Sequence, residues 1–314
     1  GGDGGGATPS GTVYFLSAGE PYSMDADGNN IQALPSYTRG YPSVENHGGN
    51  TWFLRLRPAV GTFPNGDPRT ELIAVREDDA VAVVLLSDPL LQPLETSPYY
   101  SEKGFRWATD NGVGDGKISF GARLWDSDGS LVEQGLYTAA VSFNGSGEIV
   151  GAGVPELLLT VNTMSGDNNN FLDIADHSWS PDGTMLAFTT RATSDLYLMD
   201  VITGTSILLI NSAQFPAWSP NGNFIAFTSN DGLETIDWAT LERTLLAETL
   251  VRKNSITAPE SPTWLPGGNH IVYTDYSLNL KNWSGSDDLR RISLVDGSDI
   301  ALTADGVSSL IESR

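Results

Sequence analysis

The chain has 314 residues, of which 39 are acidic and 17 are basic, so its formal net charge is −22 at pH 7. No run of Lys and Arg residues offsets this charge, which disfavours binding to nucleic acid and to anionic membrane surfaces. The chain has no cysteine, which excludes disulfides, thiolate metal sites and cysteine nucleophiles, and it has no apolar stretch near the roughly 18 to 20 residues of a transmembrane helix.

The first ten residues are rich in glycine and contain no apolar side chain larger than that of Ala7. Such a segment has nothing to bury, so we expect residues 1–10 to form a flexible tether. Short runs at 13–16 and 22–28 follow, and they indicate two β-strands, the second of which enters a turn. No strand is predicted before them.

Weak copies of one structural unit occupy the rest of the first half. A turn-forming segment at 42–49 precedes the strand-like residues 51–54, and residues 105–107 begin a further copy that continues at 118–120 after a lengthened turn. In that copy, residues 136–141 indicate the next strand.

A tryptophan, proline and glycine signature recurs three times in the second half. A self-similar period of about 40 residues, made of short apolar runs and turn residues, is typical of units with about four strands, such as propeller blades. The four tryptophans Trp107, Trp179, Trp218 and Trp264 hold the same place in their copies, which indicates a packing role. The copies lie at 179–183, 218–222 and 264–268, followed by apolar runs at 185–188, 224–227 and 270–273.

The two ends of the chain supply the remaining unit. Residues 309–313 lie where an inner strand is expected, and residues 13–16 lack one. We therefore predict an all-β fold, a six-bladed β-propeller with four antiparallel strands per blade and a ring closed by the C-terminal strand pairing with the N-terminal blade. Residues 11–314 form this single domain, with blades at about 11–36 plus 305–314, 40–95, 104–161, 176–211, 215–248 and 261–304.

The repeat is similar to that of a known family. Trp-Ser-Pro-Asp-Gly at 179–183, Ile-Ala-Phe-Thr at 225–228 and Leu-Tyr-Leu-Met-Asp at 196–200 resemble the repeat of TolB-like six-bladed β-propellers of bacterial envelopes. The resemblance is strong over 177–303 and degenerate over 11–160. It implies the fold more than an activity, because such propellers serve as binding platforms, assembly partners and enzyme accessory domains.

The resemblance also implies a location in the periplasm or at the cell surface of a bacterium. The glycine-rich tether resembles the spacer that follows the lipid-bearing cysteine of an exported bacterial lipoprotein, which would give membrane contact through an N-terminal lipid anchor. An ordinary disordered end is the alternative.

Long connections between the predicted strands mark a candidate binding face. They are the segments 55–69, 125–135, 276–288, 87–104, 163–176 and 249–261, and in a propeller these connections share one face. Large rings with a polar handle, and cations, can bind a peptide or a sugar there. His177 is a further candidate because it lies on an inner strand near the central channel. The candidate ligand- or partner-binding residues are Arg57, Tyr99, Tyr100, Trp125, His177, Lys281 and Trp283.

Metal-binding and catalytic motifs are weak in this sequence. His47, His177 and His270 fall in unlike places of the repeat, which argues against a three-histidine metal site. The acidic segments 25–29, 126–129 and 166–170 suit either Ca²⁺ or tight turns. We expect no cofactor, with Ca²⁺ as the alternative, and no catalytic residue is predicted.

The sequence favours a non-catalytic envelope binding or scaffolding protein, a monomer that holds a protein, peptide or glycan on the long-loop face. The alternative is a lyase or hydrolase that acts on polysaccharide with carboxylates at the channel mouth. The first is favoured because no cluster of His, Arg and Tyr recurs at matched blade positions.

Overall fold

The structure is a computed structural model that describes residues 9–18, 20–35, 43–78, 81–94, 105–108, 116–160, 174–190, 193–252, 255–282, 284–306 and 308–313. Throughout these residues the regular elements are β-strands, and they form six antiparallel sheets. The fold is a six-bladed β-propeller, which confirms the predicted fold class. Within the described segments no helix is long and apolar enough to cross a membrane.

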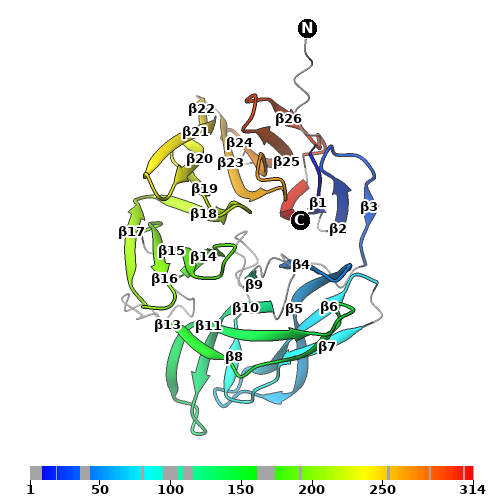
Figure 1. Cartoon of the computed structure of the whole chain (residues 1–314), viewed down its shortest axis with the longest axis vertical. Coiled ribbons are helices and arrows are strands. Elements are labelled where there is room, and N and C mark those ends of the chain that lie inside the picture. Colours follow the sequence, from blue (N-terminus) through cyan, green and yellow to red (C-terminus); the bar gives the residue numbers. More distant parts are fainter. Residues whose placement is uncertain are drawn as a thin grey trace. The chain divides into compact units, whose positions relative to one another are not determined.

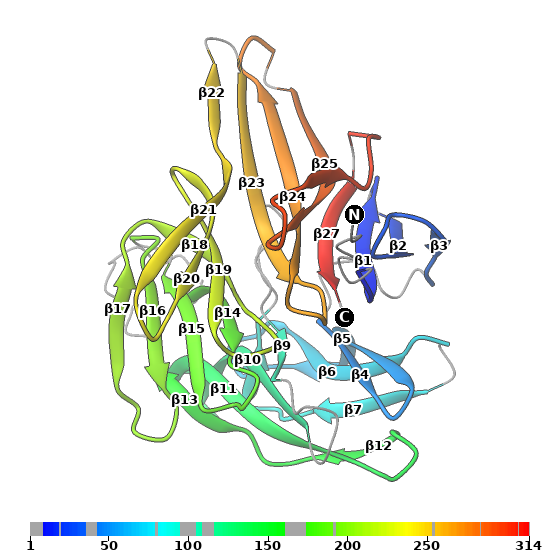
Figure 2. The same cartoon turned by 45° about the horizontal axis from the view of Figure 1, so that its top comes forward.

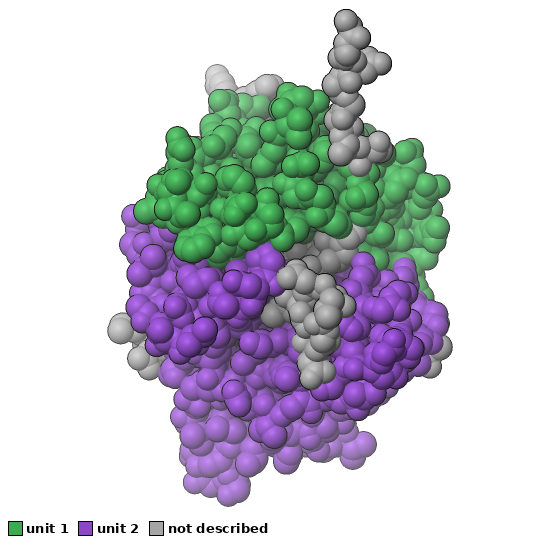
Figure 3. All heavy atoms as spheres, in the orientation of Figure 1, with its two compact units in different colours: residues 1–39, 213–314 green, residues 40–212 purple. Residues whose placement is uncertain are grey.

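The chain forms two compact units, shown in Figure 3. Unit 1 contains residues 1–39 and 213–314, and unit 2 contains residues 40–212. Each unit contains three of the six described sheets.

The first sheet of unit 1 joins the two ends of the chain (Figure 1). Val13 pairs with Ser313 and Leu16 with Ser309 in an antiparallel ladder, so the predicted closing strand is confirmed. The order in this sheet is β27 (Ser308–Ser313), β1 (Thr12–Ser17), β2 (Glu20–Asp25) and β3 (Gln32–Ala33).

The other two sheets of unit 1 follow the repeat. One is regular and has the order β18 (Ala213–Trp218), β19 (Phe224–Ser229), β20 (Gly232–Asp237) and β21 (Glu242–Glu248). The other has five strands, β22 (Leu250–Arg252), β23 (Ser255–Trp264), β24 (His270–Asn279), β25 (Ser284–Ser293) and β26 (Asp299–Ala301). Strands β23, β24 and β25 have ten residues each and lie side by side in Figure 2, whereas β26 has three.

Unit 2 contains two sheets with four strands and one with six. The first four-stranded sheet has the order β4 (Val44–His47), β5 (Asn50–Thr62), β6 (Pro68–Arg76) and β7 (Ala82–Leu86). The second has the order β14 (Ile174–Trp179), β15 (Met185–Thr190), β16 (Leu196–Asp200) and β17 (Ser206–Ile210). The six-stranded sheet contains β8 (Leu91–Pro93), β9 (Phe105–Ala108), β10 (Gly116–Trp125), β11 (Leu131–Phe143), β12 (Ile149–Ala152) and β13 (Glu156–Thr160). Because β10 and β11 are long, β10 pairs with both β8 and β9, and β11 with both β12 and β13.

The signature residues form the turn between the first two strands of a repeat. In unit 2, Ser180 Oγ donates to Asp182 Oδ1 at 2.6 Å and accepts the Met185 backbone N–H at 2.9 Å. Gly183 has a φ of 68°, a conformation that glycine adopts without steric cost. In unit 1, Leu265 replaces this serine, keeps the backbone hydrogen bonds of the turn and packs in a buried apolar cluster instead.

The repeat tryptophans are buried, as their fixed place predicts, and two of them join neighbouring sheets. In unit 2, Trp179 Nε1 donates to Ser119 Oγ on β10 at 2.8 Å. In unit 1, Trp264 Nε1 donates to the Ala217 carbonyl on β18 at 3.0 Å. Each indole therefore buries a large ring and satisfies its polar nitrogen on the adjacent sheet.

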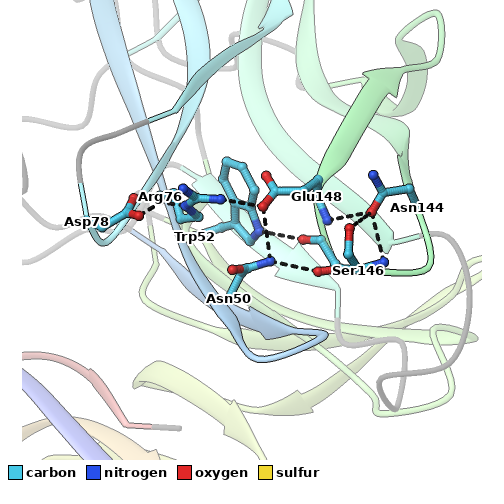
Figure 4. Close-up of polar contacts among 8 residues, drawn as sticks. Asn50, Trp52, Arg76, Asp78, Asn144, Ser146 and Glu148 are labelled. Atoms are coloured by element: carbon cyan, nitrogen blue, oxygen red, sulfur yellow. Dashed lines mark hydrogen bonds and ion pairs between the residues drawn. The ribbon is translucent and has the colours of Figure 1, made fainter.

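A second junction in unit 2 joins the turn between β4 and β5 to the turn between β11 and β12 (Figure 4). Trp52 Nε1 donates to the Gly147 carbonyl at 3.0 Å, and Asn50 Nδ2 donates to the Ser146 carbonyl at 2.9 Å. Arg76 pairs with both Asp78 and Glu148. The two turns approach so closely that a Cβ on Gly147 would lie 2.3 Å from the His47 carbonyl oxygen.

Candidate binding surface

Two hairpins of unit 2, β5 with β6 and β10 with β11, are longer than the other strands of their sheets. We call their outer ends, with β8, the hairpin platform, defined as residues 57–71, 91–93 and 122–134. The β8 strand pairs with the outer end of β10, where Leu91 lies opposite Leu124. The two tips touch, because a Cβ on Gly129 would lie 2.8 Å from the Pro64 carbonyl oxygen. Phe63, which begins the turn between β5 and β6, is fully buried.

The platform is braced by polar contacts around Trp125. The Trp125 Nε1 donates to Gln92 Oε1 at 2.9 Å, and Gln92 Nε2 donates to Asp67 Oδ2 at 3.1 Å. Asn65 Nδ2 also donates to Asp67 Oδ2, at 2.7 Å. These bonds connect the β10 end, β8 and the turn between β5 and β6, so the partly exposed face of the Trp125 ring is held in a fixed position.

The predicted binding residue Arg57 lies on the same platform. Its Nη2 donates to Glu71 Oε2 at 2.6 Å across the β5 and β6 pair, and Ser87 Oγ donates to Glu71 Oε1 at 2.7 Å. These hydrogen bonds from Arg57 and Ser87 lower the pKa of Glu71, and burial opposes them. Arg57 therefore forms an ion pair with the Glu71 carboxylate, which is ionised at neutral pH.

Exposed aliphatic side chains accompany these polar groups. Leu131 lies directly opposite Trp125 across the β10 and β11 pair, and Leu131 and Val132 are both exposed. Val60, near the end of β5, is almost completely exposed. Exposed aliphatic residues on a rigid base beside a tryptophan are features of a surface that binds another protein.

Four of the long connections predicted as loops are wrong, because most residues of 55–69, 125–135, 249–261 and 276–288 are in strands. β5 continues to Thr62 and β6 begins at Pro68, so only a short turn lies between them. Arg123 was not predicted. It is buried, its Nε donates to Gln134 Oε1 at 2.8 Å, and burial lowers its pKa although Asp67 opposes this. The alternation of 116–125 could have shown that the strand continues this far.

His177 lies in a buried network of unit 2, on β14. Its Nε2 is 2.6 Å from Ser119 Oγ, which accepts the hydrogen bond from Trp179. The serine hydroxyl can accept from Trp179 and still either donate to His177 or accept from it, so the direction of this bond follows from the tautomer of the ring. Burial and the nearby Arg106 lower the pKa of His177 to about 3, in agreement with a neutral ring.

This serine and histidine pair differs from a catalytic one. Ser119 is fully buried, and Asp176 pairs with Arg106 at 2.8 Å. Asp176 Oδ1 also accepts the backbone N–H of His177 at 2.7 Å. The arrangement holds β9, β10 and β14 together rather than presenting a nucleophile to solvent.

The remaining predicted site residues are distributed differently. Lys281 is in unit 1, exposed in the turn between β24 and β25, where its backbone N–H donates to Asn279 Oδ1 at 3.0 Å. Tyr99, Tyr100 and Trp283 lie outside the described residues. Arg57 and Trp125 thus both lie in unit 2, on the two hairpins of the platform.

Unit 1 contains a separate group of acidic residues that the sequence did not single out. Burial and Asp287 raise the pKa of Glu260, on β23, to about 7. Burial and Asp288 raise the pKa of Asp287, and Tyr276 lies opposite Asp287 in the β24 and β25 pair. A carboxyl group with such a pKa can exchange a proton near neutral pH.

The acidic turns that suit Ca²⁺ have their oxygens engaged by the chain itself. Asp25 Oδ1 accepts the backbone N–H groups of Asp27 and Asn29, at 3.1 and 2.7 Å. Asp126 Oδ1 accepts that of Ser130 at 2.9 Å. The segment 166–170 is outside the described residues. In the described part of the chain, no three His, Asp or Glu side chains are grouped so that they could hold a metal ion.

Solved structures share this fold over nearly the whole chain. The structure of putative TolB from Agrobacterium tumefaciens matches with a TM-score of 0.57 and 12% identity, covering 97% of this chain and 98% of that one. The fold is that of a TolB-like β-propeller. A chain from the crystal structure of a nidogen and laminin complex matches this TolB-like propeller with a TM-score of 0.55, 10% identity and 97% coverage of each chain. No protein-family model and no curated protein matches the sequence.

Proposed function

We propose that this TolB-like propeller is a non-catalytic binding or scaffolding protein of the bacterial envelope that holds a protein or peptide partner on the hairpin platform. The proposal rests on one observation: the exposed residues Leu131 and Val132 lie beside Trp125, whose ring is fixed by its hydrogen bond to Gln92, on the long hairpins of unit 2. A rigid aromatic side chain buries a large area at little entropic cost when a partner docks.

The similar proteins support a binding role. The similar chain from the nidogen and laminin structure, which has the same fold, comes from a complex of two proteins. The likeness to TolB supports an envelope location, in the periplasm or at the cell surface. We further propose that the protein is a monomer attached to the membrane by an N-terminal lipid anchor and that it requires no cofactor. A glycan is the alternative ligand.

Site-specific photo-crosslinking tests the proposal. A photoreactive phenylalanine analogue replaces Val132 on the platform, which is 58% exposed, or Val150 on β12, which is 63% exposed and serves as the matched control. In envelope extract we expect one discrete adduct from position 132 and none from position 150. Adding Trp125→Ala should reduce the adduct about tenfold. Equal adducts from both positions, or no effect of Trp125→Ala, would contradict the proposal.

A second candidate function rests on Glu260. Its pKa of about 7 and the nearby Asp287 suit an acid and base pair that cleaves polysaccharide, the alternative expected from the sequence. Incubation with a panel of envelope and extracellular polysaccharides tests this function. Release of reducing or unsaturated ends, lost in Glu260→Gln, would establish it, and no release across the panel would rule out this use of the pair.

A further inference from the structure

The outer strand of the last sheet of unit 2 has an unusual surface. β17 is the last strand in the order β14 to β17, and its residues Ser-Ile-Leu-Leu-Ile include no charged residue and no proline (Figure 1). Ile207 is 54% exposed and Leu208 is 49% exposed, and as consecutive strand residues they point to opposite faces. Ile202, in the preceding turn, is also exposed. Uncharged apolar edge strands readily pair with another chain.

Other outer strands of the described sheets are protected. β3 and β26 have only two and three residues, and β21 carries Glu242, Arg243 and Glu248. β7 also lacks charge, but β12 of the neighbouring sheet in unit 2 lies against it. Short length, charge and coverage are the ordinary protections of an edge, and β17 has none of them among the described residues.

Acidic residues flank β17 at both ends. Asp200 is at the end of β16, where Ile202 and Thr203 donate backbone N–H groups to its Oδ1, both at 2.9 Å. These backbone hydrogen bonds, Thr203 first, lower the pKa of Asp200, so it is ionised at neutral pH. Asp195 is at the other end, where its Oδ1 accepts the Ser212 N–H at 3.1 Å. The described residues 174–190 and 193–212 include no Lys or Arg.

We propose that the outer edge of β17 is a docking site for an extended, cationic peptide segment, which adds to the sheet as a fifth strand. Main-chain hydrogen bonds to β17 would supply the pairing, and the side chains on the two faces of the segment would pack beside Ile207 on one face and Leu208 on the other. Five strand residues span about 16 Å, so the segment has a Lys or Arg at each end of an alternating aliphatic stretch of about this length. These cations lie beside Asp195 and Asp200.

Charge selects this occupant over a second copy of the chain. Each copy has a net charge of −22, so two copies repel each other during association. A cationic segment is instead attracted to the edge. This site consists of other elements than the hairpin platform, so its existence does not depend on the proposed function.

A fluorescent peptide, Lys-Val-Thr-Val-Thr-Val-Lys, tests the proposal by fluorescence anisotropy with the full chain. We expect saturable binding that weakens with salt, and about tenfold weaker binding of the same peptide with Glu at both ends. A peptide that is N-methylated at every residue should not bind, because neither of its edges keeps the N–H groups with which a strand pairs. This control requires no change in the protein.

Three protein variants locate the site. Leu208→Lys on β17 should weaken binding about tenfold, whereas Leu245→Lys on β21, where the leucine is 44% exposed, should change it less than about twofold. Leu208→Thr, which keeps a strand-forming residue, should also weaken binding. Equal binding to both lysine variants, or equal binding of the acidic peptide, overturns the proposal. Concentration-dependent dimerisation that Leu208→Lys abolishes, without peptide binding, also overturns it in favour of a second copy.

Discussion

Replacement of Arg106 by methionine should strongly destabilise unit 2. The guanidinium of Arg106 on β9 donates to Asp176 Oδ1 and to the His177 carbonyl on β14, each at 2.8 Å. Both side chains are largely buried, at 10% and 3% relative exposure. Arg106→Met leaves the Asp176 carboxylate buried without this cation, and removing one partner of a buried ion pair costs about 3 to 5 kcal/mol.

A second variant separates charge from packing. The double variant Arg106→Met with Asp176→Leu removes both charges, so it should be more stable than Arg106→Met alone. The shared environment of the two residues means that their separate effects should not add.

Urea unfolding followed by tryptophan fluorescence measures these differences. Trp179 is a suitable reporter because it lies on the same strand as Asp176 and contacts the same network through Ser119. A loss below about 1 kcal/mol for Arg106→Met would refute the reasoning. A double variant as unstable as the single one would show that the packing of the arginine, and not its charge, stabilises the junction.

Three further predictions concern glycine, protonation and the closing strand. Gly147→Ala should lower the free energy of unfolding by more than about 2 kcal/mol, because the φ of Gly147 is 75° and the new Cβ would meet a carbonyl oxygen. Gly183 has a similar φ of 68° but open space around it, so Gly183→Ala should lower the free energy of unfolding by about 1 kcal/mol. Urea unfolding compares the two variants, and equal losses would contradict the steric argument. Because the pKa of Glu260 is raised from 4.5 to about 7, the folded state binds this proton more tightly, and the stability of unit 1 should fall by up to about 3 kcal/mol as pH rises from about 4.5 through 7. Glu260→Gln should flatten that pH profile, and an unchanged slope would refute the assignment. Deletion of residues 309–314 should lower the melting temperature clearly, since it removes the β27 ladder from β1, and an unchanged midpoint would contradict the closing role.

The regular repeats were predictable from sequence because their determinants are local. In the copy that begins at Trp218, Ser219 Oγ donates to Asn221 and accepts the Phe224 N–H, all within one turn. Because the interacting residues are close in the sequence, the motif itself predicts the turn. The pairing of β27 with β1 is distant, yet it was inferred because each end of the chain contained a fragment that completes the other.

The elements that build the hairpin platform were harder to predict. β8 pairs with β10 only because residues 91–93 are brought beside 122–124, and no local pattern encodes such a contact. Arg57 and Trp125 were chosen for their chemistry, and the structure places both on the platform. Their partners Gln92 and Glu71 are ordinary polar residues, whose importance depends on three-dimensional position.

The pairing of β1 with β27 has a consequence for biosynthesis. Nearly the whole chain separates the two strands, so β1 has no inner neighbour until the ribosome has made residues 308–313. At ordinary translation rates this interval is on the order of tens of seconds, during which the hydrogen-bonding edge of β1 and the apolar side chains of Val13 and Phe15 are uncovered. A holding chaperone that recognises apolar strands would therefore act first on the earliest part of this chain, and a delay late in synthesis should increase aggregation through that strand.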